Sequence, residues 1–175
     1  PRVPPTAPVD PERLGDGLEH GEAGVEGEAG IGKSRLVAEF ADWLPDEARR
    51  VVGHCLELGP DGPPYAPFAE IMRSLVADIG ADQLAEMVGP GRSDLAGLAP
   101  ELGRGASDQT MGRGRLFEAM AVLIERCAAD VPLVLIVEDL HWADSSTRDL
   151  LRFLMRTVAE AQVLFLLTYR RDELH

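Results

Sequence analysis

The sequence predicts an α/β domain with a mostly parallel sheet, and two observations lead to this fold class. Short, continuous apolar segments typical of buried strands alternate with longer segments whose apolar residues recur at helical spacing. The apolar run 133–137 is uninterrupted, as in strands that helices cover on both faces. At 175 residues the chain can bury a core without disulfides or metals, and we expect Cys55 and Cys127 to be small core residues.

The first 26 residues show neither pattern. Prolines and glycines dominate them, and within 18–26 only Leu18 and Val25 favour a strand. We therefore expect a flexible lead-in over 1–26, a weakened or missing strand before Gly27, and a domain that covers 27–175.

The remaining elements follow in chain order. Leu36, Val37, Phe40 and Leu44 recur at helical spacing and predict an amphipathic helix over 33–44, which Pro45 ends. The same reasoning predicts strands over 50–58, 133–137 and 163–168, helices over 67–79, 81–88 and 112–129, a loop over 89–110, and a last helix that Asp144 caps.

Residues 27–34 match the phosphate-loop pattern G-x-x-x-x-G-K-[ST]. In this pattern glycines let backbone N–H groups surround phosphates, the lysine reaches the β- and γ-phosphates, and the hydroxyl binds Mg²⁺. Lys33 is the only lysine in the chain, which makes a chance match rare. The expected nucleotide-binding residues are Gly27, Glu28, Ala29, Gly30, Ile31, Gly32, Lys33, Ser34 and Arg35.

Two acids, Glu138 and Asp139, end the apolar strand at the edge where ligands of open α/β sheets bind. One acid can hold Mg²⁺ through water, and the other can orient or deprotonate an attacking water. We assign Glu138 to the metal and Asp139 to the water, with the reverse order left open. The candidate metal residues are thus Ser34, Glu138 and Asp139, and the competing interpretation is two ordinary acids at a strand end.

Two further observations indicate which base the site binds and which residue contacts the γ-phosphate. GTPases read guanine with an Asn-Lys-x-Asp motif, but this chain has no asparagine and its lysine lies in the phosphate loop, so adenine is favoured. Arg170 follows the strand 163–168, where it can contact a γ-phosphate through charge-assisted hydrogen bonds. The alternative is an ordinary surface arginine. We expect ATP and Mg²⁺ as cofactors, and Glu138, Asp139 and Arg170 as catalytic residues.

Several segments together resemble the ATPase module of large ATP-binding LuxR-type transcriptional regulators of actinobacteria, in the STAND branch of AAA-like ATPases. These segments are 27–36, 55–58, 64–68, 115–119, 138–144 (EDLHWAD) and 168–170 (TYR). The strand 50–58, between the two motifs in sequence, is also similar to the additional-strand, catalytic-acid branch of three-layer P-loop NTPases. The resemblance implies a domain that is incomplete at both ends.

In function, the resemblance implies a nucleotide switch. ATP binding would favour an active, often oligomeric state, through self-association or contacts with other domains of the same protein, and slow hydrolysis would reset it. DNA binding is expected in a separate C-terminal domain. Two other functions stay open: a non-catalytic interaction fragment, which the weak first strand favours, and the ATPase module of a cyclase- or kinase-linked signalling protein.

The composition limits the partners of this segment. Acidic residues outnumber basic ones 30 to 17, which argues against direct nucleic-acid binding. The longest apolar runs are far shorter than the roughly 20 residues that cross a bilayer, so we expect a cytoplasmic protein without membrane contact. His141 and Trp142 are expected to pack and fix their loop rather than take part in chemistry.

Overall fold

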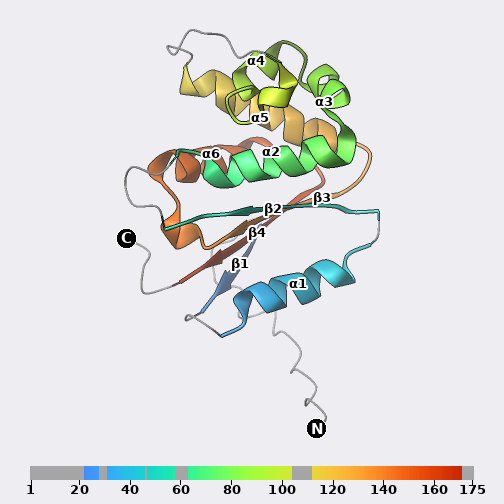
Figure 1. The fold of residues 1–175 in the computed structure, drawn as a ribbon. Coiled ribbons are helices and arrows are strands. Elements are labelled where there is room, and N and C mark those ends of the chain that lie inside the picture. Colours follow the sequence, from blue (N-terminus) through green and yellow to red (C-terminus); the bar gives the residue numbers. More distant parts are fainter. Residues whose placement is uncertain (1–21, 28–30, 46, 58–62, 104–111, 171–175) are drawn as a thin grey trace.

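The computed structural model has three layers (Figure 1). It describes residues 22–27, 31–45, 47–57, 63–103 and 112–170. A sheet of four parallel strands forms the middle layer. Helix α1 (Lys33–Trp43) lies on one face, and all other described helices lie on the opposite face. The predicted α/β class with a parallel sheet is confirmed.

The sheet places the two sequence motifs on strands that are not neighbours. Its order is β1-β4-β3-β2. The strands are β1 (Glu22–Glu26), β2 (Arg49–His54), β3 (Leu133–Glu138) and β4 (Val163–Tyr169). The strand between the phosphate-loop strand and the acidic strand is therefore β4. The strand expected at 50–58 covers Arg49–His54 and lies on the other side of β3, with which it pairs in parallel.

The strand before the phosphate loop, which was expected to be weakened or missing, is present as β1. Residues 22–26, which the sequence placed in the lead-in, pair in parallel with β4, with Glu26 opposite Tyr169. Ala23 and Val25 are partly buried against the side chains of Val37 and Leu166. Backbone pairing with an apolar neighbour stabilises a strand whose own side chains favour it weakly. Residues 1–21 of the predicted lead-in lie outside the described residues.

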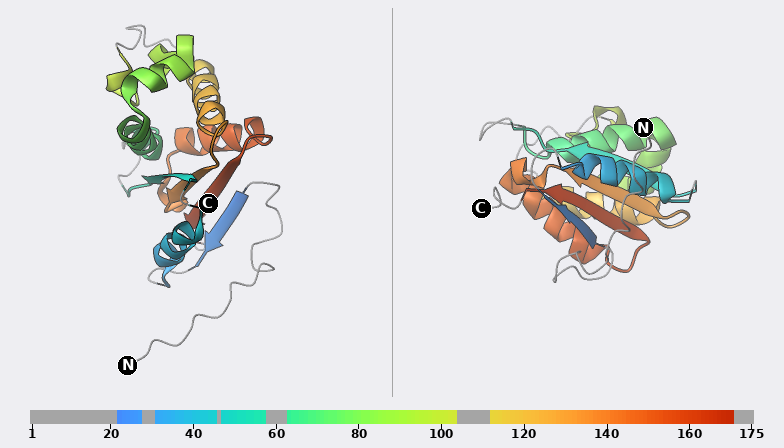
Figure 2. Two further views of the ribbon diagram at one scale, coloured as in Figure 1. Left: turned by 90° about the vertical axis from the view of Figure 1, so that its right-hand side faces the viewer. Right: turned by 90° about the horizontal axis from the view of Figure 1, so that it is seen from below.

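Helix α1 has the predicted bounds to within one residue but buries a narrower face. Val37 is 3% exposed and packs on Val134, Ile136 and Leu166 of the sheet. Leu36 and Phe40, which were expected to face inward, are 37% and 39% exposed. In the part of the chain that the structure describes, α1 is the only helix on its face of the sheet (Figures 1 and 2), so no second helix covers Leu36 and Phe40.

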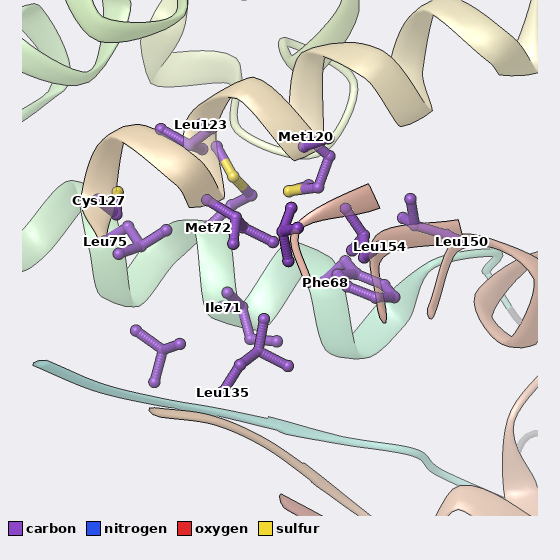
Figure 3. Close-up of a cluster of buried hydrophobic side chains, with 14 of the residues drawn as sticks. Phe68, Ile71, Met72, Leu75, Met120, Leu123, Cys127, Leu135, Leu150 and Leu154 are labelled. Atoms are coloured by element: carbon purple, nitrogen blue, oxygen red, sulfur yellow. The ribbon is translucent and has the colours of Figure 1, made fainter. Parts of the chain in front are cut away.

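The opposite face of the sheet carries the main core. Helices α2 (Ala66–Ile79), α5 (Arg113–Cys127) and α6 (Ser145–Thr157) match three of the predicted helices. Figure 3 shows side chains of α2, among them Phe68 and Met72, between those of α5 and the sheet. Burying one such side chain contributes roughly 1.5–3 kcal/mol.

Residues 89–102 are more regular than the predicted loop. After α3 (Ala81–Val88), the chain forms the 3₁₀ turn η2 (Gly89–Gly91), the short helix α4 (Arg92–Leu95) and the 3₁₀ turn η3 (Pro100–Leu102). These turns form because Leu95 and Leu102 are buried in the same core as α3 and α5. None of the helices described is long and apolar enough to span a bilayer.

Candidate functional site

The candidate site lies at the edge of the sheet where the parallel strands end. Gly27 directly follows β1, Glu138 ends β3, and Tyr169 ends β4. Helix α1 begins at Lys33, so its N-terminus lies at the same edge (Figure 1). Parallel strands with open carboxyl ends next to a helix N-terminus form the usual ligand site of this type of sheet.

A hydrogen bond from the lysine joins the two ends of the phosphate loop. Lys33 Nζ donates a hydrogen bond to the Gly27 carbonyl oxygen at 2.7 Å. Gly32 has φ +97°, a left-handed conformation that favours glycine and turns the chain into α1. Lys33 thus connects the two ends of the loop. Glu28, Ala29 and Gly30 lie outside the described residues.

Ser34 and Glu138 are in direct contact. Ser34 Oγ donates a hydrogen bond to Glu138 Oε2 at 2.7 Å, although the two residues are 104 positions apart. Ser34 lies in the first turn of α1 and Glu138 is the last residue of β3. Hydroxyl and carboxylate oxygens are the ligands that Mg²⁺ prefers, so this pair fits the metal that the family of phosphate-loop sites uses.

Asp139, the third candidate metal residue, is held by its backbone. It has the left-handed angles φ 56° and ψ 45°, which turn the chain sharply after β3. Its backbone N–H donates to Thr168 Oγ1 at 2.9 Å. Burial first, and then the charges of Asp144 and Asp139, raise the pKa of the Cys55 thiol to about 12. Of the two acids, only Glu138 contacts Ser34.

The sequence analysis missed Thr168. This threonine is 1% exposed and links the end of β4 to the turn after β3. A buried hydroxyl requires a hydrogen-bond partner. The sequence signals were its place in the TYR segment and a polar residue at the end of an otherwise apolar strand.

Arg170 lies at the expected edge. It directly follows Tyr169, whose neighbour in the sheet is Glu26 at the end of β1. The arginine is half-buried, and the pairing of Tyr169 with Glu26 places its backbone near the start of the phosphate loop. Arg35, in contrast, forms an exposed ion pair with Glu39 along α1, with 2.9 Å between Arg35 Nε and Glu39 Oε1.

The EDLHWAD segment is fixed by Asp144. As predicted, this residue caps α6, because its Oδ1 accepts a hydrogen bond from the Thr147 backbone N–H at 3.0 Å. Its Oδ2 also accepts from the Tyr65 backbone N–H at 3.4 Å, which connects the segment to the start of α2 and which the sequence did not predict. His141 is buried, and its ring centroid lies 4.9 Å from that of Trp142.

A second pair of side chains lies beside Glu138. His54 is the neighbour of Glu138 in the sheet. Glu70 of α2 accepts hydrogen bonds from the His54 backbone N–H at 2.9 Å and lies 3.0 Å from His54 Nδ1. Partial burial pushes the pKa of Glu70 upward, but the hydrogen bonds from His54 and the charges of His54 and Arg73 outweigh it and lower the pKa. Glu70 thereby connects α2 to the last residue of β2.

A family model and a curated relative match most of the chain. The family model described as "AAA ATPase domain" matches residues 14–166. An uncharacterized protein of Rhizobium meliloti (strain 1021) is 29% identical over 185 residues, which cover 90% of this chain. The chain spans 17% of the length of that relative. No solved structure matches the chain significantly.

Proposed function

The chain belongs to the AAA ATPase domain family, and from this we propose that it binds ATP with Mg²⁺ at the sheet edge described above and hydrolyses it slowly. We further propose that it is the nucleotide switch of a signal-responsive transcriptional regulator. The contact between Ser34 Oγ and Glu138 Oε2 carries the proposal. This contact brings the phosphate loop and the end of the acidic strand together, although the two motifs lie far apart in the sequence.

The phosphate groups of ATP would be held by the loop and by α1. Backbone N–H groups at the start of a helix and the positive end of its dipole favour anions. Lys33 Nζ, now on the Gly27 carbonyl, would turn to the β- and γ-phosphates. Ser34 and Glu138 would hold Mg²⁺, which when bound neutralises phosphate charge.

Hydrolysis would use the residues at the ends of β3 and β4. Water attacks the γ-phosphorus while the bond from this atom to the β,γ-bridging oxygen breaks, which yields ADP and phosphate. Because Glu138 contacts Ser34, Asp139 is the acid left to orient this water and accept its proton. Thr168 fixes the Asp139 backbone, and Arg170 would contact the γ-phosphate.

The switch role rests on two observations. The EDLHWAD and TYR segments resemble those of ATP-binding LuxR-type regulators. The relative from Rhizobium meliloti is several times longer than the matched region, as expected for a module within a larger protein. The competing interpretation, a non-catalytic interaction fragment, was favoured by the weak sequence of the first strand, and the parallel pairing of β1 with β4 speaks against it.

A thermal unfolding experiment tests nucleotide binding. A ligand that binds only the native state stabilises it, by about 2.7 kcal/mol at a concentration 100 times its Kd. We expect Mg·ATP to raise the Tm more than Mg·GTP does, and Lys33→Ala to lose this shift. Arg126→Ala, which removes an exposed cation of α5 far from the loop, should keep it. A shift that Lys33→Ala retains would rule out the phosphate loop as the binding site.

Oligomerisation tests the switch. Sedimentation velocity of the chain with ADP and with a non-hydrolysable ATP analogue should show a larger species only with the analogue. Identical sedimentation with both nucleotides, under conditions where both raise the Tm, would leave an ATP-binding domain without the proposed switch in this segment.

A further inference from the structure

A groove outside the nucleotide site lies between η2, α4 and α5. Its volume is about 560 Å³, within the range of small-molecule sites. The residues that line it include Val88, Gly91, Asp94, Gly114, Ala119 and Val122. Helices α4 and α5 are at the end of the molecule that is far from α1 (Figures 1 and 2). A ligand in this groove would therefore occupy a site separate from the phosphate loop.

The groove contains a buried carboxylate with incomplete hydrogen bonding. The Asp94 side chain is 5% exposed, and its Oδ1 accepts no hydrogen bond from the residues that the structure describes. Arg115 Nε lies 3.3 Å from this oxygen as an ion pair, but the Arg115 side chain is 64% exposed. A buried carboxylate is stable only when donors satisfy it. Asp94 thus offers an acceptor to a further N–H group, and Arg115 is free to turn toward solvent when one arrives.

The rest of the groove is shaped by small and apolar residues. A Cβ on Gly91 would lie 2.9 Å from the Ala119 Cβ, so glycine allows η2 to approach α5 closely. At Gly112 and Gly114, by contrast, a Cβ would have no described heavy atom within 4 Å. Gly114 lies in the first turn of α5, and glycine favours a helix less than alanine does. No close packing requires this glycine, and its effect is an open groove.

We propose that this groove binds a small organic cation, an ammonium or amidinium group on an apolar body of a few carbons. The cation would replace Arg115 as the partner of Asp94, and its carbon atoms would pack against Val88, Ala119 and Val122. Glu118 at the groove adds a second carboxylate, and the net charge of −13 attracts cations to the whole molecule. This site goes beyond the proposed ATPase function and does not depend on it.

NMR titration of the ¹⁵N-labelled chain with benzamidine tests the proposal. Benzamide has nearly the same shape without the charge and is the matched control ligand. We expect saturable shifts of the Gly91, Gly112 and Gly114 amides with benzamidine and none with benzamide. Shifts that are spread over the acidic surface, or that rise linearly without saturation, would show a diffuse counterion effect and overturn the proposal. Equal shifts with benzamide would remove the role of Asp94.

Two variants locate the site. Asp94→Asn should weaken benzamidine binding about tenfold or more, the effect of losing a charge-assisted hydrogen bond. Gly114→Leu should abolish binding by filling the groove while it improves the helix propensity of α5, so lost binding cannot be attributed to unfolding. Gly97→Leu, at another glycine with open space around its Cβ, should bind as the unmodified chain does. Unchanged affinity of Gly114→Leu would contradict the proposed position.

Discussion

The backbone N–H of Asp139 donates a hydrogen bond to Thr168 Oγ1 at 2.9 Å, and this bond joins the turn after β3 to the end of β4. Thr168 is buried, and Asp139 has a left-handed backbone conformation that is uncommon for residues other than glycine. The threonine therefore holds in place the acid to which we assign the attacking water. Arg170, two residues further on, lies on the same strand end.

Replacing Thr168 should lower both the free energy of unfolding and the rate of ATP hydrolysis, and the two effects can be measured separately. Thr168→Val has nearly the same shape but leaves the Asp139 N–H without its acceptor, which should cost about 1–3 kcal/mol in the free energy of unfolding. ATP hydrolysis should fall on the order of tenfold to a hundredfold because Asp139 is no longer fixed, whereas ATP affinity changes little. Urea unfolding and single-turnover hydrolysis measure the two effects. Thr168→Ser, which keeps a hydroxyl, should hydrolyse ATP faster than the valine variant, and equal rates would contradict a positioning role.

The Ser34–Glu138 pair predicts a magnesium dependence. Mg·ATP should raise the Tm of the unmodified chain more than ATP with EDTA does, and Ser34→Ala should lose this difference. Glu138→Gln should act on the same difference, so the double variant should show little more than either single variant. Ser74→Ala is the matched control, since this serine bonds only within α2, to the Glu70 carbonyl. If Ser34→Ala kept the full magnesium dependence, the pair would not be the metal site.

The sequence predicts best what depends on local pattern. Apolar periodicity located α2, α5 and α6, and the phosphate loop and the two acids were found because their residues are contiguous. Two hydrogen bonds between distant residues were missed. The hydrogen bond between Tyr65 and Asp144 spans 79 positions, and the one between Asp139 and Thr168 spans 29. Neither leaves a pattern in the sequence around either partner.

Two errors have a common physical origin. Strand β1 was judged from its own side chains, whereas its stability comes from β4 and from Val37 on α1. The burial of Leu36 and Phe40 was predicted from helical spacing. This spacing identifies the apolar face of a helix but not how much of that face the neighbouring elements cover. In both cases the tertiary environment, rather than local propensity, decides the outcome.

Gly53 should tolerate no side chain. A Cβ at this position of β2 would lie 2.4 Å from the Pro67 carbonyl oxygen, and backbone atoms of α2 cannot move aside as a flexible side chain would. Gly53→Ala should therefore lower the free energy of unfolding by about 1–3 kcal/mol, the usual cost of overpacking. Gly97→Ala has open space around the added methyl group and should change stability little. Urea unfolding of both variants checks this, and equal stabilities would mean that α2 does not approach β2 so closely.

Low pH should weaken the contact between Glu70 of α2 and His54 at the end of β2. The pKa of Glu70 is lowered in the folded chain, mainly by hydrogen bonds from His54 that overcome partial desolvation, so the unfolded state binds its proton more readily. The resulting stabilisation is present above the ordinary pKa of 4.5 and is lost as the pH falls below it, through the lower pKa of the folded chain. Because Glu70 is well exposed to solvent, the effect should be modest. Urea unfolding at pH 7 and at lower pH values should show a steeper loss of stability for the unmodified chain than for Glu70→Gln. Glu125→Gln, an exposed glutamate of α5, controls for the loss of one negative charge, and a pH dependence of Glu70→Gln as steep as that of the unmodified chain would exclude Glu70 as its source.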